Sequence, residues 1–94
     1  MVVAISSFTV NNEEAQALAA RFHRRSRRVD GHEGFLGLEV LSRATRQGTV
    51  FLLLTRWTSR EALRNYLTSE DFRSVHAESA EQDADFAMYE VVTN

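Results

Sequence analysis

The sequence predicts an α+β fold, in which a ferredoxin-like split βαβ sheet is built from elements in the order β-α-β-β-α-α-β. Three observations predict it. Four segments are rich in β-branched and aromatic residues, three others carry apolar residues at helical spacing, and a short turn joins the two middle strands. The chain has 94 residues without a repeat or a linker, so we expect a single domain over residues 1–94.

The first strand and the first helix occupy the N-terminal third of the chain. Residues 2–10, VVAISSFTV, are expected to form a strand because β-branched residues dominate them. Asn11 is expected to cap the helix that follows, with Glu14 as its capping-box partner. Gly31, in the segment DGHEG, is expected to end this helix in a left-handed conformation. The inward stripe of the helix is predicted to consist of Ala15, Leu18, Ala19, Phe22, Ser26 and Val29.

A hairpin is predicted in the middle of the chain. Its strands are residues 35–43, FLGLEVLSR, and residues 50–57, VFLLLTRW. The segment RATRQGT between them is predicted to turn at Gln47-Gly48. Because so short a link suits antiparallel neighbours, the two strands are expected to pair with each other.

Two short helices and a last strand complete the chain. Thr58-Ser59, followed by Glu61, is expected to open the first of these helices. Ser69 is expected to cap the second, and residues 85–92, DFAMYEVV, to form the final strand. The side chains that the first helix is expected to bury are Leu63, Tyr66 and Leu67.

The two faces of the predicted sheet are both mostly apolar. In the first strand Ser6 shares a face with Phe8, and Ser7 lies on the other. In the third strand one face carries Phe51, Leu53, Thr55 and Trp57, and the other carries Val50, Leu52 and Leu54. In the second strand Leu36, Leu38 and Val40 are expected to oppose Phe35 and Leu41.

Three short helices can cover only one of these faces. The uncovered face would expose an apolar patch larger than the patch of about a few hundred Å² that monomers usually expose. The sequence therefore predicts a homodimer that packs sheet against sheet.

Composition argues against several classes of function. The net charge of −2, with no aromatic residues alternating with the arginines, speaks against nucleic acid as a partner. No apolar run approaches the ~18 residues of a membrane span, and the N-terminal segment does not resemble a signal peptide, so a cytoplasmic protein is expected. Without cysteine there is neither a disulfide nor thiolate chemistry, and no GxGxxG, P-loop, HExxH or CxxC motif is present.

His76 is the notable residue of the segment SEDFRSVHAES, residues 69–79. If Ser69 caps this helix, one inward face carries Phe72, Val75, His76 and Ser79. An inward histidine has two interpretations: a core side chain bonded to a backbone carbonyl, or an imidazole that binds a metal or carries a proton near neutral pH. The residues alone leave both open.

Four segments of the chain, taken together, resemble a known family. They are AISSFTV, GFLGLEVL, LLLTRWTSREAL and SEDFRSVH. In order and spacing they resemble the dimeric α/β-barrel domains of the antibiotic biosynthesis monooxygenase superfamily, and among these the small heme-degrading monooxygenases. The resemblance implies that two protomers form a dimeric α/β barrel. It also implies that heme is both substrate and cofactor, and that the porphyrin ring is opened and iron released with O2 and an electron-donating reductase.

The resemblance also implies roles for particular side chains. His76 matches the histidine that ligates heme iron, and Trp57 matches a tryptophan at the end of the third strand that presses on the macrocycle. The asparagine of the family falls on Ser6, whose hydroxyl is shorter and offers one donor in place of two. Trp57 has a second interpretation as a core aromatic that closes the end of the sheet. A pocket for a flat apolar molecule is expected between the helices and a sheet face with Phe8, Phe22 and Trp57.

The most charged segment is RFHRRSRR, residues 21–28. One interpretation is a solvated helix end, where cations complement the helix dipole. The other has Arg21 or Arg25 reaching the rim of the pocket to bind a carboxylate of the ligand.

Two further functions stay open at this point. One is a cofactor-independent oxygenase of a polycyclic phenol or quinol, the other chemistry of the superfamily, positioned by Ser6, Ser7, Tyr66 and Tyr89. The other is a non-catalytic heme-binding dimer, which the serine at position 6 favours.

Overall fold

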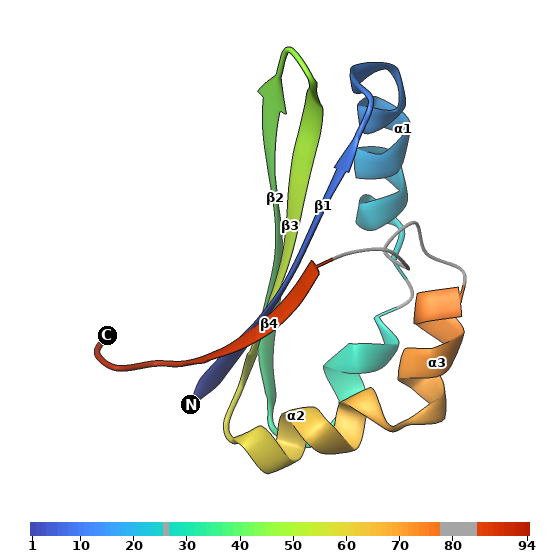
Figure 1. The fold of residues 1–94 in the computed structure, drawn as a ribbon. Helices are drawn as coiled ribbons and strands as arrows, with labels where there is room; N and C mark the ends of the chain where they lie inside the picture. The colour runs from blue at the N-terminus through green and yellow to red at the C-terminus, as the bar shows by residue number, and fades with distance from the viewer. Residues whose placement is uncertain (26, 78–84) are drawn as a thin grey trace.

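The fold is a four-stranded antiparallel sheet with its described helices on one side (Figure 1). The computed structural model describes residues 1–25, 27–77 and 85–94, with the side chains of residues 75–77 excepted. The elements are β1 (Val2–Val10), α1 (Asn12–His23), the 3-10 helix η1 (Arg28–Gly31), β2 (Phe35–Thr45), β3 (Gly48–Trp57), α2 (Arg60–Leu67), α3 (Glu70–Ala77) and β4 (Asp85–Glu90). The strand order β2-β3-β1-β4 is that of a ferredoxin-like α+β sheet, which confirms the predicted fold class.

The strand register defines the two sides of the sheet. Val2 pairs with Trp57 and Phe8 pairs with Phe51, so the alternation predicted for the first and third strands is confirmed. The helix-facing side carries Val2, Ala4, Ser6 and Phe8 of β1 and Phe51, Leu53, Thr55 and Trp57 of β3. The helix-free side carries Val3, Ile5, Ser7 and Thr9 of β1 and Val50, Leu52, Leu54 and Arg56 of β3.

The start of β2 departs from the predicted alternation. The register shifts between Phe35 and Gly37, so that Phe35 pairs with Trp57 and Leu38 with Thr55. Phe35 therefore lies on the same side as Leu38, and the prediction that Leu36 does so was wrong. A bulge adds one residue to one strand, and here it turns the Phe35 ring onto Trp57 and leaves Leu36 49% exposed.

The first helix ends earlier than predicted. It stops at His23, and Arg27, with φ 62°, is the N-cap residue of η1. Gly31 is not in the left-handed region; Gly34 is, with φ 85°. Val29 is nevertheless buried, because η1 presents it to the core. The predicted stripe residue Ser26 lies outside the described residues.

Charge gives a physical reason for this early end. A continuous helix would place Arg21, Arg24, Arg25 and Arg28 at i, i+3, i+4 and i+7, along one stripe. Like charges at these spacings destabilise a helix. Instead the Arg24 N–H bonds the Arg21 carbonyl, and the chain leaves the helix there.

The three predicted N-cap residues are confirmed. The Asn11 side chain accepts a hydrogen bond from the Glu14 backbone N–H at 2.9 Å. Ser59 accepts from the Ala62 N–H at 3.1 Å. The Ser69 hydroxyl accepts from the Phe72 N–H at 3.2 Å, and so starts α3 where the sequence indicated.

The tip of the β2–β3 hairpin is fastened to the start of α1. Thr45 pairs with Gly48, so the turn is centred one residue earlier than predicted. Asn12 donates its side-chain N–H to the Thr45 carbonyl at 2.8 Å and accepts from the Thr49 hydroxyl at 2.7 Å. Gly48 is required here, because a Cβ would lie 2.6 Å from the Val10 carbonyl oxygen.

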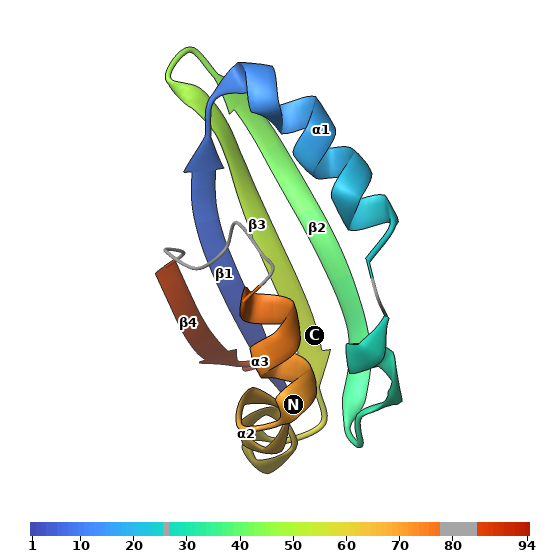
Figure 2. The ribbon, with the colours of Figure 1, turned by 90° about the vertical axis from the view of Figure 1, so that its right-hand side faces the viewer.

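The core has two parts on the helix-facing side. One joins buried residues of the sheet to η1 and α2 and consists of Val2, Ala4, Val29, Trp57 and Leu63. The other, under α1, contains Leu18 and the rings of Phe8, Phe22 and Phe51. Figure 2 shows α1 and α3 lying over different parts of this side of the sheet.

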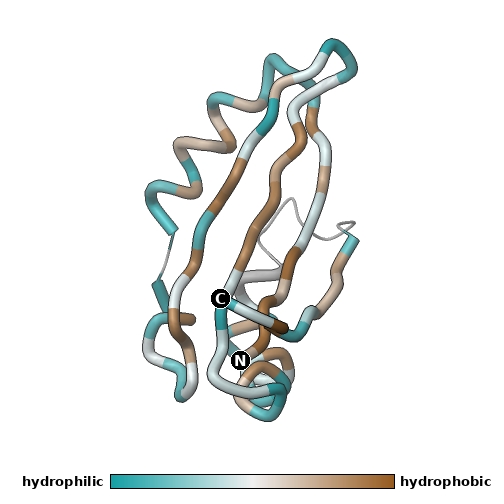
Figure 3. The backbone as a smooth tube through the Cα atoms, turned by 90° about the vertical axis from the view of Figure 1, so that its left-hand side faces the viewer, coloured by the Kyte–Doolittle hydropathy of each residue, from teal (hydrophilic) through white to brown (hydrophobic). Residues whose placement is uncertain are grey.

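The helix-free side presents partly exposed apolar residues (Figure 3). Ile5, Leu52 and Leu54 are half-buried, Leu41 is 45% exposed and Tyr89 is 55% exposed. None of the described helices is long and apolar enough to cross a membrane.

Candidate functional site

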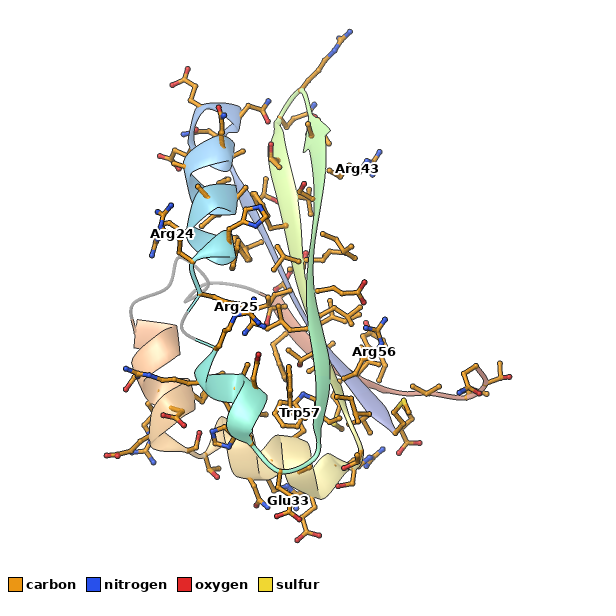
Figure 4. All side chains as sticks on the ribbon, turned by 180° about the vertical axis from the view of Figure 1, so that it is seen from behind. Arg24, Arg25, Glu33, Arg43, Arg56 and Trp57 are labelled. Atoms are coloured by element: carbon orange, nitrogen blue, oxygen red, sulfur yellow. The ribbon has the colours of Figure 1, made fainter. Side chains whose placement is uncertain are left out.

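Trp57 lies at the centre of an aromatic cluster between the sheet and α2 (Figure 4). Its side chain is 0% exposed. Phe35 meets it edge-on, with ring centroids 5.5 Å apart, and the indole Nε1–H donates to the Thr55 hydroxyl at 2.9 Å. Trp57 therefore has its polar group satisfied inside the core.

Tyr66 covers one face of this tryptophan. Its side chain extends from α2 and stacks on Trp57, with ring centroids 5.2 Å apart and ring planes inclined by 26°. Two more rings make T-shaped contacts with Tyr66. The ring centroid of His32 lies 4.9 Å from that of Tyr66, and the centroid of Phe72 lies 5.4 Å from it. The inward stripe of α2 had indicated that Tyr66 is buried, but periodicity within one helix could not show that its ring lies on Trp57.

Ser6 lies on the helix-facing side, as Trp57 does, but not next to it. It is half-buried and pairs with Leu53 on one side and Phe86 on the other. Ser6 is four residues along β1 from Val2, the partner of Trp57, which puts the two about 13 Å apart at the usual strand rise. They could contact only different parts of one large ligand.

Apolar surface stays open beside Ser6. Phe86 and Met88 of β4 pair with Ser6 and Ala4, so they lie on the helix-facing side. They are 50% and 39% exposed. This edge of the sheet therefore offers apolar contact area next to the serine.

The three phenylalanine rings under α1 fill the other end of this side. The centroids of Phe8 and Phe22 are 6.3 Å apart, and Phe51 lies 5.7 Å from Phe8. Phe8 is six residues along β1 from Val2, about 20 Å from the level of Trp57. The structure thus brings Phe8 and Phe22 together and leaves Trp57 at the opposite end.

Arg25 lies in the segment between α1 and η1. Figure 4 shows Arg25 extending toward the sheet and Arg24 extending away from it. The Arg25 guanidinium bonds Asp30 at 3.0 Å, and this hydrogen bond, together with the nearby charges of Arg25 and Arg27, lowers the pKa of the Asp30 carboxyl. A ligand carboxylate would have to compete with Asp30 for Arg25. Arg21 is exposed in the last turn of α1.

His76 lies in the last turn of α3. Figure 2 shows this helix over the helix-facing side of the sheet. The His76 side chain is outside the described residues. The start of the same helix is described, and there His32 Nε2 lies 2.9 Å from Asp71 Oδ2. This contact connects α3 to the residue that follows η1.

The fold and these residues define a class of protein: an α+β ferredoxin-like domain with an aromatic cluster between one side of its sheet and its helices. The sequence model of the family described as antibiotic biosynthesis monooxygenase matches residues 1–78. The chain belongs to this family.

Known proteins agree with that assignment. The chain is 31% identical over 78 residues to a heme-degrading monooxygenase of Halalkalibacterium halodurans, a match that covers 82% of this chain and 66% of that protein, just under two thirds. The structure of the heme degrader MhuD of Mycobacterium tuberculosis, with two hemes bound in its active site, superposes with a TM-score of 0.79 at 26% identity, over 100% of this chain and 98% of MhuD. SnoaB of Streptomyces nogalater, a cofactor-independent oxygenase, shares the fold at 19% identity, with a TM-score of 0.70 over 99% of this chain and 94% of SnoaB.

Proposed function

We propose that this protein is a heme-binding monooxygenase that opens the porphyrin ring and releases iron, using O2 and an external electron donor. The observation that carries the proposal is the placement of Ser6 and the Trp57–Tyr66 stack on the side of the sheet over which α3 lies. The family membership and the heme-degrading relatives support it.

The described residues fit a large, flat and apolar substrate. Aromatic rings dominate the helix-facing side, and Phe86 and Met88 leave apolar surface accessible there. The arginines near the end of α1 could meet carboxylates at the edge of such a molecule. Trp57 is completely buried, so the aromatic side chain that contacts such a substrate would have to be Tyr66 or one of its neighbours.

Each residue then has a role in this proposal. His76 would hold heme through its iron, Tyr66 with Trp57 behind it would form an aromatic wall, and Ser6 would donate a hydrogen bond to the bound substrate. Arg21 and Arg25 bind the carboxylates, and Phe22 contributes to the apolar boundary. When bound, heme supplies both the iron that activates O2 and the carbon framework that is oxidised. The protein residues bind and orient it and exclude water.

A hemin titration of the metal-free protein tests the proposal. We expect a shifted Soret band that His76→Ala loses and that His23→Ala keeps, since His23 is an exposed histidine in α1. Ascorbate and air should then bleach the band of the wild type and release iron to a chelator. An unchanged Soret band in the wild type, or an unaltered complex in His76→Ala, contradicts it.

A cofactor-independent oxygenase is the second candidate, with Ser6, Ser7, Tyr66 and Tyr89 as its positioning residues. The residues considered for it lie on different sides of the sheet: Ser6 on the helix-facing side, and Ser7 and Tyr89 on the helix-free side. Only Ser6 and Tyr66 could position one substrate within a protomer. Oxygen uptake by metal-free protein with an anthrone-like phenol favours this candidate. Hemin that binds and survives ascorbate favours a non-catalytic heme-binding dimer.

The homodimer is part of the proposal, with the helix-free sides of two copies facing each other. Supporting it, Ile5 and Leu54 pair at the centre of that side, and no described helix covers them. Leu54→Asp should convert a dimer to a monomer in light-scattering chromatography. Phe86→Asp, at an exposed phenylalanine of β4 on the helix-facing side, should leave the dimer intact. A monomeric wild type contradicts this part.

A further inference from the structure

His32 and Asp71 join two segments that are 39 residues apart in the sequence. Their side chains are 22% and 45% exposed, so the contact between Nε2 and Oδ2 is partly shielded from water. His32 directly follows η1, and Asp71 lies in the first turn of α3. The pair therefore connects the η1 end of the molecule to the helix that contains His76.

We propose that the His32–Asp71 pair is a positioning device that fixes α3 against η1 and thereby places the last turn of α3 over the helix-facing side. The part of this proposal that concerns heme rests on the proposed function. The part that concerns α3 stands on the described contacts alone.

Two contacts on adjacent residues constrain the helix. Phe72 packs edge-on against Tyr66, and Asp71 bonds His32 from a position about 100° away around the helix axis. A helix held only by Phe72 could rotate about that contact, whereas a second contact at Asp71 opposes the rotation. Position 76 follows Phe72 by one turn, so its place depends on the same two contacts.

The same imidazole also bears on the aromatic cluster. The rings of His32 and Tyr66 make a T-shaped contact, with ring centroids 4.9 Å apart and planes inclined by 73°. The His32 ring that bonds Asp71 through Nε2 therefore also contacts Tyr66. Tyr66 in turn stacks on Trp57. The pair links α3 and the aromatic wall through one side chain.

Glu70 provides a matched control. Both Glu70 and Asp71 are acidic residues in the first turn of α3, where a carboxylate favours the helix through its dipole. Among the described residues, the hydrogen bond to His32 is made by Asp71. Asp71→Ala thus removes the dipole contribution and the pair, while Glu70→Ala removes the dipole contribution alone.

Amide hydrogen exchange of residues 72–77 tests the positioning role without any ligand. His32→Leu and Asp71→Ala should each speed exchange about three- to fivefold, which is within the range expected for the loss of one hydrogen bond. The effect of the double variant should be smaller than the sum of the two single effects, since both single variants lose the same contact. Asp71→Asn, which keeps an acceptor oxygen, should stay close to the wild type, and so should Glu70→Ala.

The hemin complex gives a second measurement. His32→Leu and Asp71→Ala should weaken the Soret shift of the wild type, and Asp71→Asn should restore it. If the exchange pattern is as expected but hemin leaves the wild-type spectrum unchanged, the proposed function fails and the positioning role stands. If Asp71→Ala and His32→Leu exchange as Glu70→Ala does, the positioning role is overturned whether or not hemin binds.

Discussion

Tyr66 lies stacked on Trp57, with ring centroids 5.2 Å apart and ring planes inclined by 26°. Because Trp57 is fully buried, a ligand on the helix-facing side would meet the tyrosine before the tryptophan. Trp57 is also the only tryptophan of the chain, so its fluorescence reports on this one stack.

Tyr66→Ala should uncover Trp57. We expect a loss of about 2–4 kcal/mol in the free energy of unfolding, because an aromatic ring is removed from a packed cluster. Water that reaches the indole should shift its emission to longer wavelength. Tyr66→Phe keeps the ring and should preserve both properties. Urea unfolding followed by fluorescence measures the two effects together, and an unshifted emission in Tyr66→Ala would show that other groups bury Trp57.

Gly34→Ala should destabilise the fold strongly. The φ angle of Gly34 is +85°, and a Cβ would lie 2.4 Å from the Ala62 Cβ and 2.7 Å from the Thr58 hydroxyl. Backbone strain and the clash together should lower the free energy of unfolding by about 2–4 kcal/mol. Gly31→Ala is the control, since a Cβ there meets nothing within 4 Å and the φ angle is ordinary. Equal stability of the two variants in thermal unfolding would refute this account.

Ser6→Asn should raise the rate of hemin breakdown, by several-fold or more. The amide extends the donor by one carbonyl and adds a second N–H on the helix-facing side. Loss of the Soret band with ascorbate and air measures the rate. Ser7→Asn makes the same change on the helix-free side and should leave the rate unaltered, provided that chromatography shows the same oligomer. A faster reaction in both variants would contradict a specific role of the side chain at position 6.

The Arg25–Asp30 pair should contribute to stability only above acid pH. The hydrogen bond from Arg25 lowers the pKa of Asp30 below its ordinary value of 3.8. A lowered folded-state pKa means that the contribution is present above that value and is lost as pH falls through the folded-state pKa. The difference in free energy of unfolding between wild type and Asp30→Asn should therefore be constant near neutral pH and shrink in acid.

Much of the sheet could be read from local pattern. The alternation in β1 and β3 predicted which residues share a side, and Asn11, Ser59 and Ser69 predicted where helices begin. These features depend on a few neighbouring residues, so a sequence displays them directly.

The features that were missed depend on contacts between distant segments. The bulge that moves Phe35 onto Trp57 is invisible where both faces of a strand are apolar. The apolar spacing from Phe22 to Val29 continues through the arginines although the helix does not. The stack of Tyr66 on Trp57 and the pair of His32 with Asp71 arise only when separate elements meet.

The Asn12 side chain is hydrogen-bonded to Thr45 and Thr49 at the tip of the β2–β3 hairpin. These bonds fix the first turn of α1 to this end of the sheet. These hydrogen bonds should make the hairpin end of the molecule stiffer than the end at α2 and α3. Accommodation of a bulky ligand is therefore expected at the opposite end, where α2 and α3 meet through the rings around Trp57 and an exposed ion pair joins Arg60 of α2 to Glu90 of β4.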